Sequence, residues 1–191
     1  MTLGPLLEAA LGAQAACKSA DIRCCVIGGL AVQRWGEPRY TADVDLSVLV
    51  ESGQELRIAQ ALLARLQPRI ADAVTFALRS RIVLAQSPGG IGVDIALAGL
   101  PYEVRVMERS SDWDLGANVF LRTCSAEDLL VMKAFAGRDK DWADVTSILE
   151  RQGRHLDLDL VRRELAPLLA AKEAPGLADE FERRIARTLD H

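Results

Sequence analysis

Two aspartates separated by one residue are the part of this sequence that most clearly suggests chemistry. Asp43 and Asp45 flank Val44, and the apolar run Leu46-Ser-Val-Leu-Val50 follows them. Because successive side chains of a strand point to opposite faces, a strand here places both carboxylates on one face and turns Val44 inward. Two ionised carboxylates side by side repel each other, and a divalent cation with hard oxygen ligands is the usual way to make that arrangement tolerable. The pair therefore predicts a metal site.

A glycine pair precedes the two aspartates. Cys24-Cys-Val-Ile27 has the composition of a short buried strand, and Gly28 and Gly29 follow it directly before the helix-like Leu30-Ala-Val-Gln-Arg-Trp35. A strand, a glycine turn and a helix start present free backbone N–H groups and the positive end of the helix dipole, both of which attract phosphate. A plain tight turn would also account for the pair, but the aspartates that follow favour a phosphate site.

In this order and spacing, the two motifs resemble the minimal nucleotidyltransferases of the DNA polymerase β superfamily, and within it the abortive-infection (AbiEii-like) toxin group. Gly28-Gly29 and Asp43-x-Asp45 match the family's signature, and Arg39-x-Thr41 looks like a variant common among toxin-like members. The resemblance covers roughly residues 24 to 150. Many relatives carry Gly-Ser where this chain has Gly-Gly, so a hydroxyl contact to phosphate is missing and backbone amides would replace it.

The resemblance implies a third carboxylate on a later strand and a lysine on a helix that follows. Gly92-Val-Asp-Ile-Ala-Leu97 supplies Asp94 between apolar neighbours, where an unpaired charge is costly to bury. A strand-end acid paired with an arginine is the alternative. Ser125 has the position of an N-cap before a helix that contains Lys133. In the family such a lysine reaches the nucleotide's phosphates, whereas a snorkelling lysine on a partly buried helix is the alternative.

Charged residues after Gly137 continue the pattern that the resemblance implies. Asp141 and Asp144 lie near one face of the helix expected there, and similar lysine, arginine and aspartate patterns close the active site of toxin-like members. Two structural roles are the alternatives. Asp139 and Asp141 would cap the helix, and Lys140 would form a solvent-exposed pair with Asp144.

Composition limits the classes of function. The chain has 191 residues, is 50% hydrophobic and 26% charged, and carries a net charge of −4, so its surface is no general trap for nucleic acid and any RNA acceptor must be bound locally. Its four cysteines show no paired metal-ligand spacing and fit a reducing compartment, which predicts a cytoplasmic protein. The apolar run 3–16 lacks a basic start and contains Glu8, so a helix opened by Pro5 is favoured over a signal peptide. No run is long enough to span a membrane.

The expected fold class is α/β: a nucleotidyltransferase-type mixed sheet flanked by helices, with a small helical C-terminal region. The catalytic core is expected over residues 1–122 and the helical region that completes the site over 123–191. Residues 53–66 predict an amphipathic helix, 81–85 and 91–97 a hairpin, and 119–122 a further strand. Residues 101–108 fit a short helix, although their alternation also permits a strand.

The function implied is metal-dependent transfer of a nucleoside monophosphate from a nucleoside triphosphate to an acceptor, by a toxin acting on tRNA with an antitoxin partner. The cofactor would be Mg²⁺ or Mn²⁺. The resemblance assigns catalysis to Asp43, Asp45, Asp94 and Lys133, metal binding to the three aspartates, and nucleotide binding to Gly28, Gly29, Arg39, Thr41, Lys133 and Asp141. The alternatives are an antibiotic-type enzyme that modifies a small molecule, and a non-catalytic protein that binds a nucleotide or partner.

Overall fold

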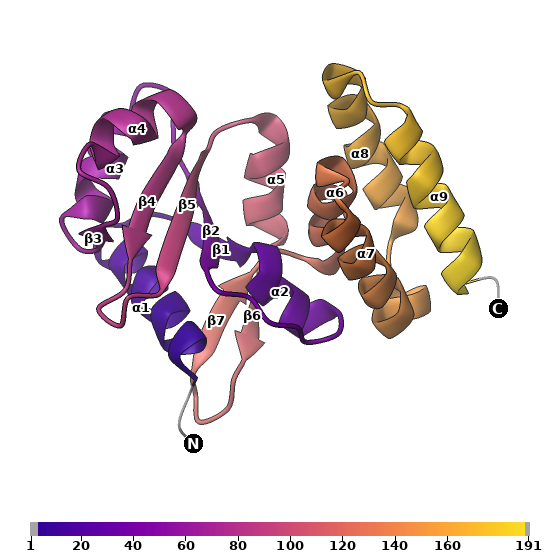
Figure 1. The fold of residues 1–191 in the computed structure, drawn as a ribbon, viewed down its shortest axis with the longest axis horizontal. Coiled ribbons are helices and arrows are strands. Elements are labelled where there is room, and N and C mark those ends of the chain that lie inside the picture. Colours follow the sequence, from indigo (N-terminus) through magenta and orange to yellow (C-terminus); the bar gives the residue numbers. More distant parts are fainter. Residues whose placement is uncertain (1–3, 190–191) are drawn as a thin grey trace. The chain divides into compact units, whose positions relative to one another are not determined.

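One mixed β-sheet organises the first part of the chain. The computed structural model describes residues 4–189. Residues 1–3 of the expected catalytic core, which include the first residue of the apolar run 3–16, and residues 190–191 of the expected helical region lie outside the described residues. The strands are β1 (Cys24–Ile27), β2 (Val44–Leu49), β3 (Gln67–Pro68), β4 (Ile82–Gln86), β5 (Gly92–Ala98), β6 (Ser111–Asp114) and β7 (Phe120–Thr123). Within the described residues they form one seven-stranded sheet in the order β3-β4-β5-β2-β1-β7-β6 (Figure 1). The α/β fold class is confirmed.

Helices follow most of the strands and dominate the C-terminal part. They are α1 (Pro5–Ser19), α2 (Gly28–Trp35), α3 (Glu55–Leu63), α4 (Ala73–Ser80), α5 (Pro101–Arg109), α6 (Ala126–Ala136), α7 (Asp139–Gln152), α8 (Leu158–Lys172) and α9 (Gly176–Leu189), with a 3₁₀ turn at Gly153–His155. Over the described residues, no helix combines the length and the apolar character that a membrane span requires.

Contacts divide the chain into two compact units. The first holds the residues up to Leu30 together with Tyr40–Cys124, and so contains the sheet with α1, α3, α4 and α5. The second holds Ala31–Arg39 and the residues from Ser125 onward, and so contains most of α2 with α6 to α9. Helix α2 therefore begins in one unit and ends in the other.

The core of the first unit lies on one face of the sheet. Alternate residues of β2 and β5 are fully or almost fully buried there and pack with α1, α3 and α4; they are Val44, Leu46, Val48, Val93, Ile95 and Leu97. Because side chains alternate along a strand, the residues between them project from the opposite face. Asp45 and Asp94 are among these residues, so the core positions of both strands fix the direction of both carboxylates.

Residues 101–108, for which the sequence permitted either a helix or a strand, lie in a helix. Residues 101–109 form helix α5 because Pro101 occupies the first turn and the Glu103 carboxylate accepts hydrogen bonds from the N–H groups of Gly99 and Leu100, at 2.7 and 2.8 Å. The hairpin expected from 81–85 and 91–97 is confirmed as the antiparallel pair β4 and β5. Helix α4 and the short strands β3 and β6 were not predicted from the sequence.

The second unit is a cluster of helices around α6, which contacts α7, α8 and α9. Ser125 caps α6 as expected, since its Oγ accepts a hydrogen bond from the N–H of Asp128 at 3.0 Å. Gly137 ends α6 with a φ of 68°, a left-handed conformation that glycine adopts without strain. Apolar residues of these helices are buried, and they include Leu129, Leu130, Val145, Ile148, Leu149, Val161 and Phe181.

Candidate active site

Three carboxylates lie on one face at the start of two neighbouring strands. Strands β2 and β5 run parallel, and their register sets Asp45 directly beside Asp94. Asp43 lies one residue before β2 and two before Asp45, so it shares that face. The side chains of Asp43 and Asp94 are 53% and 34% exposed. The three residues were predicted from the sequence to form one site, and all of them lie in the first unit.

The glycine turn lies against the same row of residues. Ile27, the last residue of β1, pairs with Asp45, and Gly28 follows with a φ of +65°. A Cβ atom built on Gly28 would lie 2.0 Å from Oδ2 of Asp45, and one on Gly29 would lie 2.6 Å from Oγ1 of Thr41. Both glycines are therefore needed for space, and Gly28 for its backbone conformation as well. They form the first turn of α2, where N–H groups have no partner within the helix.

Gly92 leaves room for the side chains of Asp43 and Arg69. A Cβ atom at this position would lie 2.2 Å from Oδ1 of Asp43 and 2.5 Å from Nη1 of Arg69. We expect Gly92→Ala to displace both side chains, to lower the free energy of unfolding by about 1–3 kcal/mol, and to reduce nucleotide binding. Gly89→Ala, in the same hairpin, is the matched control because its nearest foreign atom is 3.8 Å away. Urea unfolding of both variants checks this, and equal stability for the pair would contradict it.

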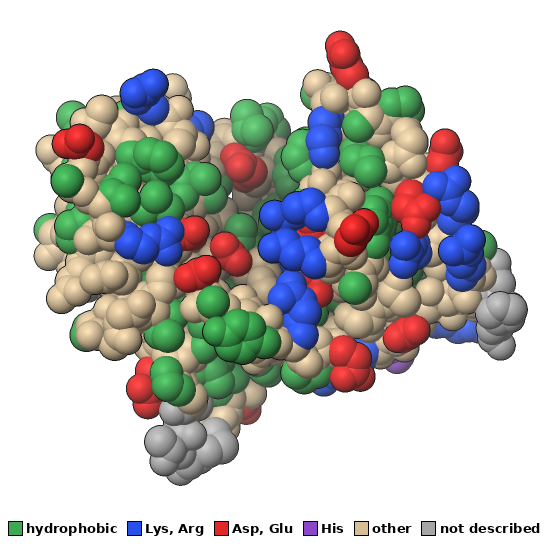
Figure 2. Space-filling view, viewed as in Figure 1, with side chains coloured by type: hydrophobic (Ala, Val, Ile, Leu, Met, Phe, Trp, Pro, Cys, Tyr) green, Lys and Arg blue, Asp and Glu red, His purple; other side chains and the backbone are tan. Residues whose placement is uncertain are grey.

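Arg69 is a member of the cluster that sequence reasoning missed. Its Nη2 lies 2.5 Å from Oδ1 of Asp94, and its Nη1 lies 3.9 Å from Oδ1 of Asp43. Asp94 is therefore paired with an arginine, as the alternative interpretation of this residue had it. The cluster is open to solvent, and Figure 2 shows acidic and basic side chains adjoining on the surface over the start of β5.

The carboxylates suit a divalent cation by their chemistry. Hard cations such as Mg²⁺ and Mn²⁺ take oxygen ligands, and Gly28 and Gly92 leave the space around two of the carboxylates clear. As the side chains stand, no three acidic, histidine or cysteine residues of the described chain converge closely enough to hold a metal. The guanidinium of Arg69 supplies the compensating positive charge in this arrangement.

A second cluster of charges lies inside the helical unit. Lys133 of α6 is 8% exposed, and its Nζ lies 2.8 Å from Oδ2 of Asp144 and 3.4 Å from Oδ1 of Asp141, both on α7. The lysine is thus buried between two carboxylates rather than snorkelling into solvent. The alternative interpretation, a solvent-exposed pair of Lys140 with Asp144, is wrong because the Asp144 side chain is only 2% exposed.

Two arginines complete this cluster. Arg39 makes a two-pronged contact with Asp144, with Nε and Nη2 at 2.5 and 2.7 Å from the carboxylate oxygens. Arg138 contacts Asp141 through Nε at 2.5 Å, and its backbone N–H also donates to that carboxylate, which confirms Asp141 as a capping residue of α7. With Lys133 these arginines set three positive charges against two negative ones. Cationic side chains gathered in this way are groups that can bind an anionic ligand.

The decisive comparison is with a known protein family. Residues 10–190 match the family described as the nucleotidyl transferase AbiEii toxin of type IV toxin–antitoxin systems. The chain belongs to this family. It is therefore a nucleotidyltransferase of the AbiEii toxin group, and the resemblance seen in its motifs is confirmed over nearly its whole length. No curated protein matches it in sequence.

Two solved structures of ANT(2'')-Ia share the fold of this AbiEii-family chain. A solution structure of the antibiotic-resistance factor ANT(2'')-Ia is 16% identical over 90% of this chain and 93% of that one, with a TM-score of 0.51. A crystal structure of ANT(2'')-Ia in complex with adenylyl-2''-tobramycin is 16% identical over 84% and 95%, with a TM-score of 0.52. An antigenic nucleotidyltransferase-like protein from Paracoccidioides brasiliensis is 17% identical over 97% and 96%, with a TM-score of 0.46.

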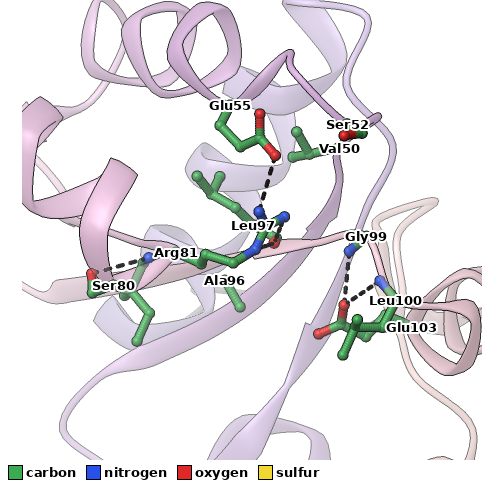
Figure 3. A pocket seen from close by; sticks show the side chains of 11 residues that line it. Val50, Ser52, Glu55, Ser80, Arg81, Ala96, Leu97, Gly99, Leu100 and Glu103 are labelled. Atoms are coloured by element: carbon green, nitrogen blue, oxygen red, sulfur yellow. Dashed lines mark hydrogen bonds and ion pairs between the residues drawn. The ribbon is translucent and has the colours of Figure 1, made fainter.

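A pocket elsewhere in the AbiEii-family fold has a structural role. It has a volume of about 470 Å³ and is lined by Ala96 and Leu97, near the end of β5 (Figure 3). Asp94 is near the start of that strand. Its arginine, Arg81, donates to the carbonyl oxygen of Leu97 at 2.7 and 3.0 Å and to Glu55 at 3.0 Å. Glu103 caps α5 from the same pocket. The charged groups lining it are thus already paired within the protein.

The helical unit of this AbiEii-family chain is expected to lose stability in acid. Burial alone would raise the pKa of Asp144 and of Asp141, but hydrogen bonds from Arg39 and Arg138 and the charge on Lys133 hold both below the ordinary 3.8. Carboxyls with a lowered folded-state pKa stabilise the fold fully above the unfolded-state pKa, and this contribution disappears as pH falls through the folded-state pKa. We expect the free energy of unfolding to fall steadily below about pH 4.

Urea unfolding between pH 7 and pH 2.5 measures this dependence. Asp144→Asn removes one of the two titrating groups, so its stability should fall less steeply with acid than that of the parent. A slope unchanged by the substitution would show that other carboxyls govern acid unfolding.

Proposed function

We propose that this protein transfers a nucleoside monophosphate from a nucleoside triphosphate to tRNA in a reaction that depends on a divalent cation. One observation carries the proposal: Asp43, Asp45 and Asp94 occupy one face at the start of adjoining strands, beside a glycine turn that opens a helix. Family membership supports nucleotidyl transfer itself. The metal, the acceptor and the residue roles are the parts proposed here.

Asp43, Asp45 and Asp94 would hold the divalent cation. When bound, it would neutralise the triphosphate and lower the pKa of the acceptor hydroxyl. The acceptor oxygen forms a bond to the α-phosphorus, and the bond from that phosphorus to the bridging oxygen breaks. Pyrophosphate leaves with the electron pair, and Asp94 takes the acceptor's proton before passing it to solvent.

Backbone and cationic groups would bind the triphosphate. The N–H groups of Gly28 and Gly29 are suited to phosphate oxygens because they open helix α2, and Thr41 packs directly against Gly29. Lys133 and Arg39 would stabilise the charge that develops on pyrophosphate, and Asp141 would hold Lys133 in position. The gathering of Lys133, Arg39 and Arg138 in one cluster supports this role.

Modification of a small molecule is the second candidate. The observation that favours it is the shared fold with ANT(2'')-Ia, one structure of which holds adenylyl-2''-tobramycin. A toxin acting on tRNA should arrest growth when it is expressed without its antitoxin, whereas a small-molecule enzyme should not be toxic by itself. Both candidates place the protein in the cytoplasm, where nucleoside triphosphates are available.

The test is incubation of purified protein with each α-labelled nucleoside triphosphate, Mg²⁺ or Mn²⁺, and total tRNA or tobramycin. The Asp43→Ala/Asp45→Ala double variant is the control. Label on tRNA with the parent alone is the expected result. Label on tobramycin and none on tRNA would show that the acceptor is a small molecule and not tRNA. Label on neither would overturn the proposal.

A further inference from the structure

The backbone of Arg69 is fixed in line with the carboxylate cluster. Arg69 follows β3, and its N–H donates to the carbonyl oxygen of Leu84 at 3.0 Å, which extends the pairing of β3 with β4. Leu84 pairs with Asp94, and Asp94 pairs with Asp45. These residues form one row across the sheet. Because directly paired residues project to the same face, Arg69 points to the side on which the carboxylates lie.

The side chain spans the width of β4 to reach its partners. Adjacent strands lie about 4.8 Å apart, so the guanidinium crosses the Leu84 position to reach Asp94 on β5. Its Nη2 is 2.5 Å from Oδ1 of Asp94, and its Nη1 extends toward Asp43. Gly92 lies beneath it, where a Cβ atom would come within 2.5 Å of Nη1. The cluster thus has space built for a guanidinium.

Arg69 and a divalent cation would bind the same carboxylate. An arginine in a protein stays protonated, so its charge is permanent, and it occupies an Asp94 oxygen that a metal would bind. The side chains of Arg69 and Asp94 are 32% and 34% exposed, so solvent reaches the pair and it can exchange. The guanidinium of Arg69 and a divalent metal ion would therefore compete for the Asp94 carboxylate.

We propose that Arg69 is an internal counter-cation that competes with the divalent cation for Asp94 and so sets the metal affinity of the nucleotide-free enzyme. Without metal, the guanidinium compensates the carboxylates and keeps the cluster ordered. Metal binding moves Arg69 off Asp94 while its backbone stays in the sheet. This inference rests on the proposed function, because it takes the carboxylates as the metal site.

Mn²⁺ titration of the nucleotide-free protein, with free Mn²⁺ measured by electron paramagnetic resonance, tests the proposal. We expect Arg69→Gln to lower the Kd for Mn²⁺ by about five- to tenfold, with a smaller difference in high salt. Arg79→Gln is the matched control, because it removes the same charge from an exposed site on α4 and should change the Kd by less than about twofold. Asp94→Asn in the parent should weaken binding.

The outcomes separate this inference from the proposed function. A parent that binds Mn²⁺ through Asp94, with an unchanged or higher Kd in Arg69→Gln, overturns the competition and leaves the metal site standing. An equal gain in affinity for Arg79→Gln also overturns it, because net charge would then explain the effect. Absence of Mn²⁺ binding in both the parent and Arg69→Gln overturns the metal site and the inference together.

Discussion

Asp45→Asn is expected to lower the rate of nucleotidyl transfer by a factor on the order of 10³ and to leave the fold intact. Asp45 has Asp94 beside it in the register and Gly28 against its carboxylate, so it lies where the cation and the phosphates are proposed to meet. Asparagine keeps the size and shape of the aspartate side chain, so stability should change little. Single-turnover transfer of an α-labelled nucleotide, together with thermal unfolding, measures both effects.

Asp72→Asn is the matched control for this substitution. It makes the same chemical change at an exposed acid before α4 whose side chain makes no capping hydrogen bond. Transfer by this variant should equal that of the parent. Full activity in Asp45→Asn would remove the carboxylate cluster from the mechanism, and loss of folding in that variant would show that its role is structural.

Asp144→Ala is expected to lower the free energy of unfolding by about 3 kcal/mol. The substitution leaves the buried ammonium of Lys133 with the Asp141 carboxylate, at 3.4 Å. It also removes the carboxylate to which Nε and Nη2 of Arg39 donate. Breaking a buried ion pair by removing one partner leaves an uncompensated charge, which is why the loss should be large. Guanidinium chloride unfolding at pH 7 gives the measurement.

Asp139→Ala, on the same helix, separates burial from charge. Asp139 is exposed at the first position of α7, so its removal should cost no more than about 0.5 kcal/mol. Similar losses for Asp144→Ala and Asp139→Ala would mean that the buried cluster adds little to stability and that the positions of its charges serve binding alone.

The sequence predicted the parts of the site that depend on local spacing. Asp43 lies directly before β2 and Asp45 within it, and Gly28 follows directly from β1, so alternation and turn chemistry were enough to place them. Asp94 could be added because the family resemblance implies a third carboxylate on a later strand, and this residue is an isolated acid between apolar neighbours. Helix α6 was predictable from its Ser125 cap.

Contacts between distant residues could not be predicted in this way. Arg69 follows a strand of only two residues that carries no pattern of its own, and its partner Asp94 lies on a strand that it reaches across β4. Arg39 and Asp144 are 105 residues apart. Local spacing instead suggested Lys140 as the partner of Asp144, and only the packing of α7 shows that Asp144 faces the interior. Burial of these charges depends on tertiary contacts, which a helical period alone does not specify.

The most direct test of the central claim compares α- and γ-labelled nucleoside triphosphate in parallel reactions with tRNA. Transfer of a nucleoside monophosphate predicts that the α label appears on the RNA and that the γ label is released as pyrophosphate, in the parent and not in Asp45→Asn. Appearance of the γ label on the RNA would mean phosphoryl transfer, and its release as free phosphate would mean hydrolysis. Either result would contradict the account.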